Sequence, residues 1–377
     1  MLIGINALYF RPGLVGGSEV YLRNLLATLA RIDNENDYLL FVNPDGAGSL
    51  NDGGRFEEVV MDYTPGSTAA RLWNEQVALP RLAKRNGVKV IHSPGNIMPL
   101  VPGAPSVLTV HDLQQAYYPE YFPARVRAIR RASCRASAGR NNMVIATSEA
   151  TASDLSGRMG LDRKKIRVIH HGMPDGFDAP AAEQLAHVRG KYLLPDRFVY
   201  FGAHTYPHKN HAGLVRAFRR LKDEGNVDGL GLVLSGGVRS GFGVLRKEME
   251  QCRNGNDILF LGDIPAKDVA CLYRLATLFA FPSLFEGFGF PVLEAMACGC
   301  PVVASDRTSV PEVAGDAALL VDPEDEEAFA AAMSRVLCGG QLKKSMVEKG
   351  KARAAGFTWE KTARRTLDVY REAADGN

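Results

Sequence analysis

The sequence is poor in the features that mark several large classes of protein. None of its apolar runs reaches about 18 residues, so no segment is predicted to span a membrane. The formal net charge is only +3 over 377 residues, which does not favour a nucleic-acid-binding protein. The opening residues, MLIGINALYF, carry no basic segment before a longer apolar core, so we read them as a first strand and not as a signal peptide.

Two further patterns are missing. The six cysteines are scattered, without the paired spacing of a zinc site or the density of a disulfide framework. A reducing cytoplasm is the simplest interpretation. Neither half of the chain has G-x-G-x-x-G after a strand with an acidic residue about 20 positions further on, which argues against a dinucleotide-dependent oxidoreductase.

What the sequence does contain is typical of an α/β protein with two domains. Its 46% hydrophobic and 23% charged residues fit a globular chain, and 377 residues are too many for one ordinary core. Short apolar runs alternate with helical patterns in both halves, as in doubly wound parallel sheets. Strands are expected at 2–7, 38–43, 56–61, 88–93, 106–111, 142–148, 165–170, 198–203, 230–235, 258–261, 278–281, 301–304 and 318–321.

The alternation is interrupted once. Residues 173–195 hold three prolines and two glycines without an apolar strand run, so we expect an interdomain linker there. This leaves a Rossmann-like N-terminal domain at 1–172, which we expect the C-terminal helix 358–377 to complete, and a second Rossmann-like domain at 196–357. Ligands bind outside the carboxyl ends of the strands in such sheets, so the loops of both domains are expected to line a cleft.

The most informative stretch is 281–305, FPSLFEGFGFPVLEAMACGCPVVAS. A loop with Glu286 leads into a helix that carries Glu294, and Gly287 and Gly289 allow close approach of the backbone to a ligand. A helix N-terminus can hold an anion and carboxylates can hold hydroxyls, which together fit a phosphorylated sugar. Exposed glutamates usually only solvate a surface, but the three phenylalanines around Glu286 argue against that interpretation.

A second stretch is 201–211, FGAHTYPHKNH, where a strand ends, Gly202 turns and a helix begins. Lys209 precedes that helix, and a cation beside free backbone N–H groups suits a diphosphate. The alternative is a solvated loop lysine. The three histidines of the segment could form a zinc site, but no acidic ligand accompanies them and the helix start would separate them. These histidines are His204, His208 and His211.

Other candidate residues also follow predicted strands. His111 and Asp112 come directly after one, where an imidazole could contact a sugar hydroxyl, transfer a proton or make only a structural hydrogen bond. Three glycine-containing turns could contact a nucleotide or could be ordinary turns. They are Gly16–Gly17, Ser235–Gly236 and Leu261–Gly262.

One segment is strongly basic. Residues 121–148 contain no acidic residue, and several arginines fall on a predicted helix. Such a helix could bind anionic lipid headgroups, or it could be a solvated face paired to acids elsewhere. The arginines are Arg125, Arg127, Arg130, Arg131 and Arg135, of which 127, 130 and 131 are expected to share one face.

The segment Glu286-GFGFPVL-Glu294 resembles the E-x7-E signature of retaining glycosyltransferases with the GT-B fold, in family 4. The similarity extends to VGGSEVYLRNLL near the start, VLTVHDL, PHKN at 207–210 and SVPEVAGDAALLVDP, and so covers nearly the whole chain. The residues of these motifs are most similar to those of bacterial mannosyl- and rhamnosyltransferases that assemble surface polysaccharides such as lipopolysaccharide.

The resemblance implies roles for individual residues. Glu294 would bind the ribose hydroxyls, Glu286 the donor sugar and Lys209 the diphosphate, while His111 would approach the transferred sugar. Many relatives have arginine where this chain has His208, so the leaving-group charge would rest more on the lysine. The expected catalytic residues are His111, Lys209 and Glu286, and the expected donor-binding residues are Gly16, Gly17, Asp112, Gly202, His208, Ser235, Gly236, Leu261, Gly262, Gly287, Phe288, Gly289 and Glu294.

The resemblance therefore implies a hexosyltransferase that uses a nucleoside diphosphate sugar, with GDP-mannose as the first choice, and needs no metal. Its other partner would be a saccharide or lipid-linked saccharide, and it would act in the cytoplasm or at the inner face of the cytoplasmic membrane. The alternatives are a rhamnosyl- or N-acetylhexosaminyltransferase, a nucleotide-sugar epimerase and a nucleotide-binding scaffold without catalysis.

Overall fold

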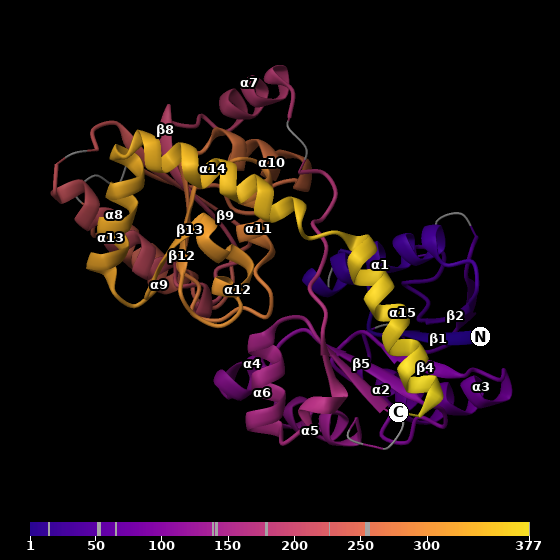
Figure 1. Cartoon of the computed structure of the whole chain (residues 1–377). Coiled ribbons are helices and arrows are strands. Elements are labelled where there is room, and N and C mark those ends of the chain that lie inside the picture. The colour runs from indigo at the N-terminus through magenta and orange to yellow at the C-terminus, as the bar shows by residue number, and fades with distance from the viewer. Residues whose placement is uncertain are drawn as a thin grey trace. The chain divides into compact units, whose positions relative to one another are not determined.

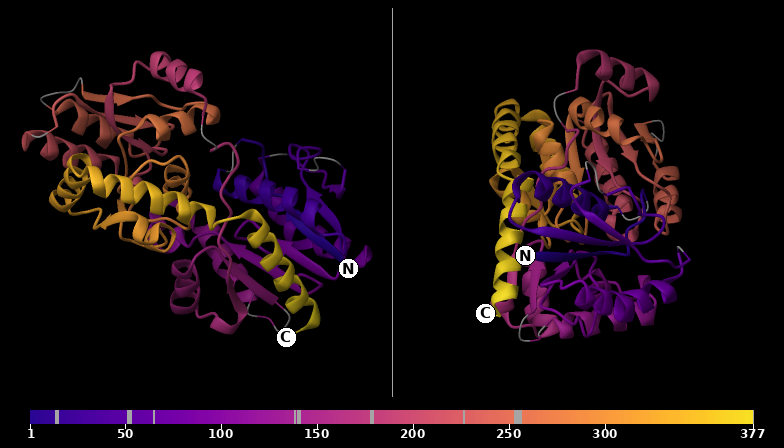
Figure 2. Two further views of the ribbon diagram at one scale, coloured as in Figure 1. Left: turned by 45° about the horizontal axis from the view of Figure 1, so that its top comes forward. Right: turned by 90° about the vertical axis from the view of Figure 1, so that its right-hand side faces the viewer.

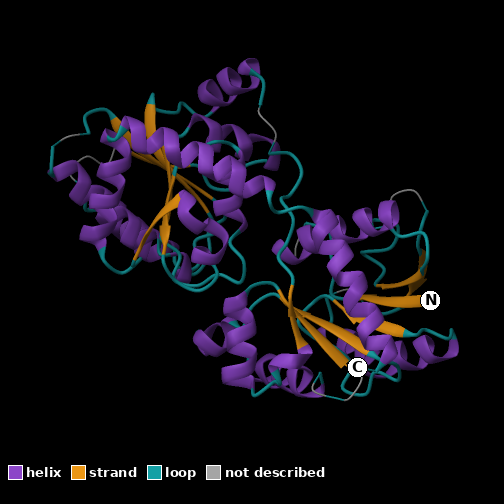
Figure 3. Ribbon diagram, in the orientation of Figure 1, coloured by secondary structure: helices purple, strands orange, loops and turns teal. Residues whose placement is uncertain are grey.

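The computed structural model of the chain describes residues 1–376 apart from 14–15, 51–53, 65, 138, 140–141, 178–179, 226 and 253–256. The chain forms two compact units. The N-terminal unit comprises Met1–Gly172 and Thr358–Asn377, and the C-terminal unit comprises Met173–Phe357 (Figure 1). In each unit helices lie on both faces of one parallel sheet (Figure 3).

The described residues of the N-terminal unit form a seven-stranded sheet in the order β3-β2-β1-β4-β5-β6-β7, with every pair parallel. Most of its strands are buried because helices cover both faces, and all five residues of β5 are buried, whereas the edge strand β3 is partly exposed. The expectation of a doubly wound sheet is confirmed. The strands are β1 Leu2–Ala7, β2 Asp37–Val42, β3 Glu57–Val60, β4 Val90–Ser93, β5 Ser106–Val110, β6 Asn142–Ala146 and β7 Ile166–Val168.

The helices of this unit follow the strands in the usual alternation. One of them is interrupted by a π-helical turn, η1, between α2 and α3. None of the helices among the described residues of the chain is long and apolar enough to cross a membrane. The bounds are α1 Gly17–Ile32, α2 Thr68–Trp73, η1 Asn74–Ala78, α3 Leu79–Arg85, α4 Gln114–Tyr117, η2 Pro119–Tyr121, α5 Ala124–Ala136, α6 Glu149–Met159, η3 Arg163–Lys165 and α15 Trp359–Asp375.

The last helix, α15, is part of the N-terminal unit although it ends the chain (Figure 2). The Thr358 hydroxyl caps it, as expected, by accepting a hydrogen bond from the Lys361 amide at 3.3 Å. Thr362 donates to the His170 carbonyl at 2.7 Å, and the Tyr370 hydroxyl lies 2.7 Å from His92 Nδ1. These buried contacts attach α15 to the sheet.

The C-terminal unit also contains one parallel sheet. Its described residues form six strands in the order β10-β9-β8-β11-β12-β13. The strands are β8 Arg197–Gly202, β9 Leu230–Ser235, β10 Ile258–Phe260, β11 Leu278–Phe281, β12 Val302–Ser305 and β13 Ala318–Val321. The helices are α7 Ala182–Lys191, η4 Pro207–Lys209, α8 His211–Asp223, α9 Phe242–Glu250, α10 Ala266–Leu275, α11 Phe290–Ala297, α12 Val310–Ala314, η6 Gly315–Ala317, α13 Glu326–Cys338 and α14 Gly340–Ala355.

Each sheet has one point at which the strand order reverses. In the N-terminal unit this switch lies between β1 and β4, and in the C-terminal unit it lies between β8 and β11. The loops after the two strands of a switch diverge to opposite faces, which leaves a crevice at the carboxyl edge of the sheet. These two edges are therefore where ligand-binding residues are expected.

The segment between the two expected domains differs from the sequence-based expectation. Residues 173–195 are not only a linker, because they contain α7, which packs on α10 in the C-terminal unit. Lys191 contacts Asp268 at 2.6 Å and the Tyr192 hydroxyl donates to the same carboxylate at 2.8 Å. The helix was missed because it buries only Val188 and so shows no apolar stripe.

Candidate active site

The centre of the C-terminal unit's site is an ion pair across the switch between β8 and β11. Lys209 ends the short helix η4 that follows β8, and Glu286 lies in the loop that follows β11. The Lys209 Nζ atom lies 2.6 Å from Glu286 Oε1, and only 18% and 11% of the two side chains are exposed. The structure thus brings together two residues that lie 77 positions apart in the sequence.

Hydrogen bonds on both sides hold the loop that carries Glu286. Its backbone N–H donates to Thr308 Oγ1 at 3.0 Å, and its carbonyl accepts from Ser309 Oγ at 3.0 Å. Thr308 has a φ of +56°, a conformation that a β-branched residue rarely adopts and that persists only where its surroundings enforce it. The Leu284 N–H also donates to the His208 carbonyl at 2.7 Å, which joins the loops after β8 and β11.

Glu294 lies on α11, the helix after the same loop. The Tyr273 hydroxyl on α10 donates to its Oε2 atom at 2.9 Å. Burial raises the pKa of Glu294 from its ordinary value of 4.5 to about 7, and the hydrogen bond from Tyr273 offsets this only in part. Part of the residue remains accessible, so its carboxyl group is suited to accept hydrogen bonds from a ligand's hydroxyls.

The loop between the two glutamates ends at Gly289, whose φ of +102° requires glycine and which stands before the first turn of α11. Among the residues that the structure describes, no side chain caps this helix. Phe288 is 5% exposed and its ring packs against Phe290 and Phe357. Its side chain therefore belongs to the core, so that only its backbone, with Gly287 beside it, is left for the expected contact with a donor.

The remaining residues predicted in this unit lie at the ends of β8, β9 and β10. Gly202 and Ser235 end neighbouring strands at the same register. The Gly236 N–H donates to the Gly262 carbonyl at 2.7 Å, and Leu261 N–H donates to Leu234 at 2.8 Å. Gly236 has a φ of +121°, and a Cβ there would come 2.1 Å from the Ala203 carbonyl oxygen. A side chain at Gly236 would therefore clash with the neighbouring backbone.

The three histidines near β8 make separate contacts. His204 Nδ1 accepts from the Gly237 N–H at 2.8 Å, whereas His211 Nε2 bonds with the Ala203 carbonyl at 3.1 Å. His208 is buried and stacks on Tyr206. No group of three potential metal ligands occurs among the residues that the structure describes.

In the N-terminal unit, His111 follows β5 at the carboxyl edge. Its backbone N–H donates to Asn96 Oδ1 and its Nε2 bonds with the Pro94 carbonyl, both at 2.7 Å. Burial lowers its pKa, so the imidazole is neutral near pH 7. A carbonyl can only accept, so Nε2 carries the proton and Nδ1 is the acceptor. Asp112 is used locally, because its carboxylate accepts from the Gln114 N–H at 3.0 Å.

Gly16 and Gly17 stand where α1 begins. Gly16 has a φ of +59°, and a Cβ there would meet no atom within 4 Å. The glycine is therefore required by backbone conformation and not by crowding. Val15, the first residue of the motif VGGSEVYLRNLL, lies outside the described residues, as does Leu14 before it.

The basic segment forms the helix α5, but one of its arginines does not lie on the predicted face. Arg125, Arg127, Arg131 and Arg135 are exposed. Arg130 does not share their surface, because its guanidinium donates to Gln115 at 2.8 Å and lies 5.2 Å from the Phe122 ring centre. Within the described residues none of the four exposed arginines is paired with an acid.

Sequence reasoning missed several supporting residues. Tyr273 reaches Glu294 from another helix, 21 positions earlier, so no local pattern marks it. Ser309 was quoted only as the first residue of SVPEVAGDAALLVDP and Thr308 was not quoted at all, although both fix the backbone of Glu286. Such partners are set by tertiary packing and not by spacing along the chain.

Two protein families match most of the chain between them. Residues 189–353 match the family described as Glycosyl transferases group 1. Residues 15–176 match Glycosyltransferase Family 4. The first match contains Lys209, Glu286 and Glu294, and the second contains His111.

Individual relatives agree with these families. O-antigen chain mannosyltransferase B of Escherichia coli is 32% identical over 269 residues, which cover 71% of this chain and 70% of that protein. The serotype-specific mannosyltransferase WbdA of E. coli is 29% identical over 235 residues, which cover 61% of this chain but only 29% of that protein. The chain therefore spans a small part of the second relative.

Among solved structures, the Anabaena protein HepE in complex with UDP and glucose superposes on the chain with a TM-score of 0.74. The superposition covers 98% of this chain and 99% of the Anabaena chain at 21% identity. At this level of identity, the similarity shows that the two chains share a fold.

Proposed function

The chain belongs to the glycosyltransferases of group 1 and family 4, and we propose that it transfers a hexose from a nucleoside diphosphate sugar to a saccharide or lipid-linked saccharide, with retention at the anomeric carbon. Each unit has the doubly wound sheet of GT-B glycosyltransferases. Mannose from GDP-mannose is the proposed donor, because the E. coli relatives are named mannosyltransferases. A rhamnosyl- or N-acetylhexosaminyltransferase is the alternative.

The ion pair of Lys209 and Glu286 is the observation that carries this proposal. It lies at the switch point of the C-terminal sheet, where ligands bind in such folds. A diphosphate offers more negative charge to Lys209 than Glu286 does, so the lysine would turn to the phosphates when the donor binds. Glu286 would then be released to accept hydrogen bonds from the hydroxyls of the sugar.

The reaction that these residues would support is a substitution at the anomeric carbon. The bond between that carbon and the diphosphate oxygen breaks, and a bond to the acceptor oxygen forms on the same face. The acceptor's proton passes to the departing phosphate. Negative charge grows on the leaving group, so a fixed cation at Lys209 would lower the barrier. Since protein groups supply this charge, we propose that the reaction needs no metal.

His111 would contribute a contact and not a charge. Its Nε2 proton is engaged by the Pro94 carbonyl and its pKa is lowered by burial. The neutral ring would therefore use Nδ1 to accept a hydrogen bond from a hydroxyl of the transferred sugar. Glu294, with Tyr273 behind it, would accept from the ribose hydroxyls of the nucleotide.

We also propose that the protein works at the inner face of the cytoplasmic membrane. The exposed arginines of α5 would bind anionic headgroups and place the chain beside a lipid-linked acceptor. The support is the absence of acidic partners for Arg125, Arg127, Arg131 and Arg135 in the described part of the chain.

Replacing Lys209 tests the proposal. Lys209→Ala is expected to lower kcat for sugar transfer from GDP-mannose by about 10²–10³-fold, the usual cost of removing one charge-stabilising donor. The matched control is Lys267→Ala, because Lys267 is an exposed lysine of the same unit. Transfer rates at saturating donor are measured for both variants, with melting temperatures as a check on folding. Full activity of Lys209→Ala would contradict the assignment.

A further inference from the structure

A buried glutamate and an arginine lie together in the N-terminal unit, outside the residues considered so far. Glu75 is 2% exposed and lies on η1, the π-helical turn between α2 and α3. Arg71 lies four positions earlier on α2, and 30% of its side chain is exposed. Single π-helical turns are rare and occur frequently at functional sites.

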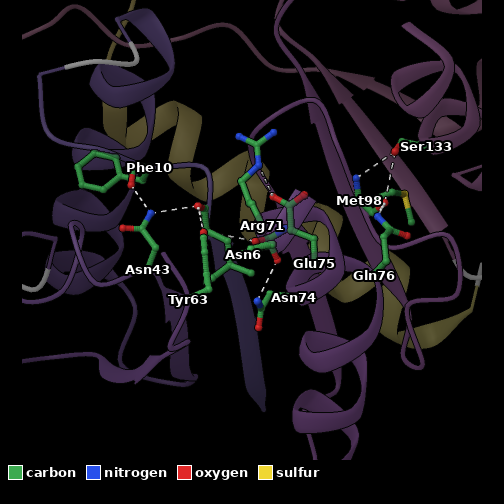
Figure 4. A network of polar contacts seen from close by, with 12 residues as sticks. Asn6, Phe10, Asn43, Tyr63, Arg71, Asn74, Glu75, Gln76, Met98 and Ser133 are labelled. Atoms are coloured by element: carbon green, nitrogen blue, oxygen red, sulfur yellow. Dashed lines mark hydrogen bonds and ion pairs between the residues drawn. The ribbon is translucent and has the colours of Figure 1, made fainter. Parts of the chain in front are cut away.

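The contact between the two side chains is not a hydrogen bond. Arg71 Nε lies 3.7 Å from Glu75 Oε1, beyond hydrogen-bonding distance (Figure 4). Among the residues that the structure describes, neither Arg71 Nε nor Glu75 Oε2 has a hydrogen-bond partner, although both atoms are buried. Buried polar atoms are normally paired, because an unpaired one costs about 1–3 kcal/mol. A donor and an acceptor are therefore held side by side without satisfying each other.

The pair lies at the carboxyl edge of the sheet, beside the switch between β1 and β4. The Tyr63 hydroxyl, next to the pair in Figure 4, donates to the Leu8 carbonyl just after β1 at 2.8 Å. Gln76, the residue after Glu75, donates to the Met98 carbonyl at 3.1 Å and accepts from the Leu100 N–H at 2.8 Å, in the loop after β4. The helical turn with Glu75 is thus attached to the loop after β4 through Gln76, and the segment before α2 is attached to the loop after β1 through Tyr63.

The same loops lead to His111. Pro94, whose carbonyl binds the His111 ring, is followed by Gly95. A Cβ on Gly95 would come 2.5 Å from the Tyr9 ring, so Tyr9 packs directly on this loop. The negative charge of Glu75 contributes to raising the pKa of Tyr9, after burial and two other charges, which places the carboxylate near the tyrosine. Glu75 and His111 therefore border one edge of one sheet.

We propose that Arg71 and Glu75 form an acceptor subsite, in which one hydroxyl of a saccharide binds between the guanidinium and the carboxylate. A hydroxyl is both donor and acceptor, so it can accept from Arg71 Nε–H and donate to Glu75 in the same position. Because a carboxylate beside the guanidinium would repel a phosphate, the pair suits a neutral sugar better than a phosphate. The inference rests on the proposed function, since a sugar acceptor is needed only by a transferase.

The test separates binding of the acceptor from the chemistry of the donor. Octyl α-mannoside serves as the acceptor and GDP-mannose as the donor. Acceptor KM is measured for Glu75→Gln, Arg71→Gln, Arg71→Lys and the double variant of Glu75→Gln with Arg71→Gln. Arg81→Gln is the matched control, because Arg81 is an exposed arginine on the next helix segment. Hydrolysis of GDP-mannose without acceptor and its effect on the melting temperature report the donor site.

Each single variant is expected to raise the acceptor KM at least tenfold, while donor hydrolysis and the donor-induced melting shift stay unchanged. Arg71→Lys keeps the charge but loses Nε–H, so it should behave like Arg71→Gln. The double variant should raise the acceptor KM little more than either single variant does, because both residues bind the same hydroxyl. Arg81→Gln should match the wild type.

Three outcomes are distinguishable. An acceptor KM within twofold of wild type in both single variants overturns the acceptor subsite. A larger effect on mannose 6-phosphate than on octyl α-mannoside overturns the assignment to a neutral hydroxyl. A wild-type chain that neither binds nor uses any nucleotide sugar counts against the proposed function itself. Glutamine has nearly the same shape as glutamate, so at least the Glu75→Gln variant is expected to fold.

Discussion

At the scale of the residue, the acidic groups of the C-terminal unit differ because their surroundings differ. Glu286 has the cation of Lys209 at 2.6 Å. Glu294 has the neutral hydroxyl of Tyr273, and its burial raises its pKa to about 7. The two carboxylates therefore have different partners, and burial brings the pKa of Glu294 close to neutral pH.

The pKa of Glu294 predicts how the stability of the chain depends on pH. Its value in the folded state lies above the ordinary 4.5, so the folded chain retains a proton that the unfolded chain releases. The free energy of unfolding should therefore fall as pH rises from about 4.5 through 7. Glu294→Gln removes this loss, so its stability relative to wild type should increase by about 1–3 kcal/mol between pH 5 and pH 8.

Urea unfolding of wild type and Glu294→Gln over this pH range measures the difference. Glu348→Gln is the control, because Glu348 is an exposed glutamate on α14 of the same unit. Its stability relative to wild type should not change with pH. A pH-independent difference for Glu294→Gln would show that the carboxyl group titrates normally.

At the scale of the element, α5 has an exposed basic face and a partly buried arginine. Arg127, Arg131 and Arg135 are exposed, whereas Arg130 is held by Gln115 and lies over Phe122. The spacing of the arginines indicated a basic helix. It could not show that one of them contacts Gln115 on α4 and the ring of Phe122, because those contacts depend on how the chain folds back.

This face should bind anionic membranes. Each exposed arginine near an anionic surface contributes about 1 kcal/mol, so changing Arg127, Arg131 and Arg135 together to Gln should lower binding by roughly 100-fold. Co-sedimentation with vesicles of phosphatidylglycerol and phosphatidylcholine measures the effect, and added salt should weaken it. The control changes three exposed basic residues of α3, Arg81, Lys84 and Arg85, to Gln. Unchanged binding after the α5 substitutions would leave this helix as a solvated surface.

The elements that the sequence failed to indicate share a physical reason. α14 runs over 16 residues but buries only Met346, Gly350 and Ala354, so it shows almost no apolar face. The π-helical turn at Asn74–Ala78 differs from an α-helix in the span of its backbone hydrogen bonds, which no composition reveals. Most strands were predictable because both their faces are covered, and their sequences are therefore mainly apolar.

At the scale of the whole molecule, the chain forms two doubly wound units whose sheets each reverse order once. This architecture followed from the sequence, since apolar runs alternate with helical patterns in both halves. The motif that resembles E-x7-E located Glu286 and Glu294, and the end of β8 located Lys209. The sequence could not place Arg71 and Glu75 beside a switch point, because their position depends on contacts with the loops after β1 and β4.

Transfer of mannose with retention can be read from the configuration of the product. The protein is incubated with GDP-α-mannose and octyl α-mannoside, and the anomeric configuration of the new linkage is read by NMR, with UDP-glucose as the comparison donor. The account predicts an α-linked mannosyl product from GDP-mannose. A β-linked product, or transfer from UDP-glucose but not from GDP-mannose, would contradict it.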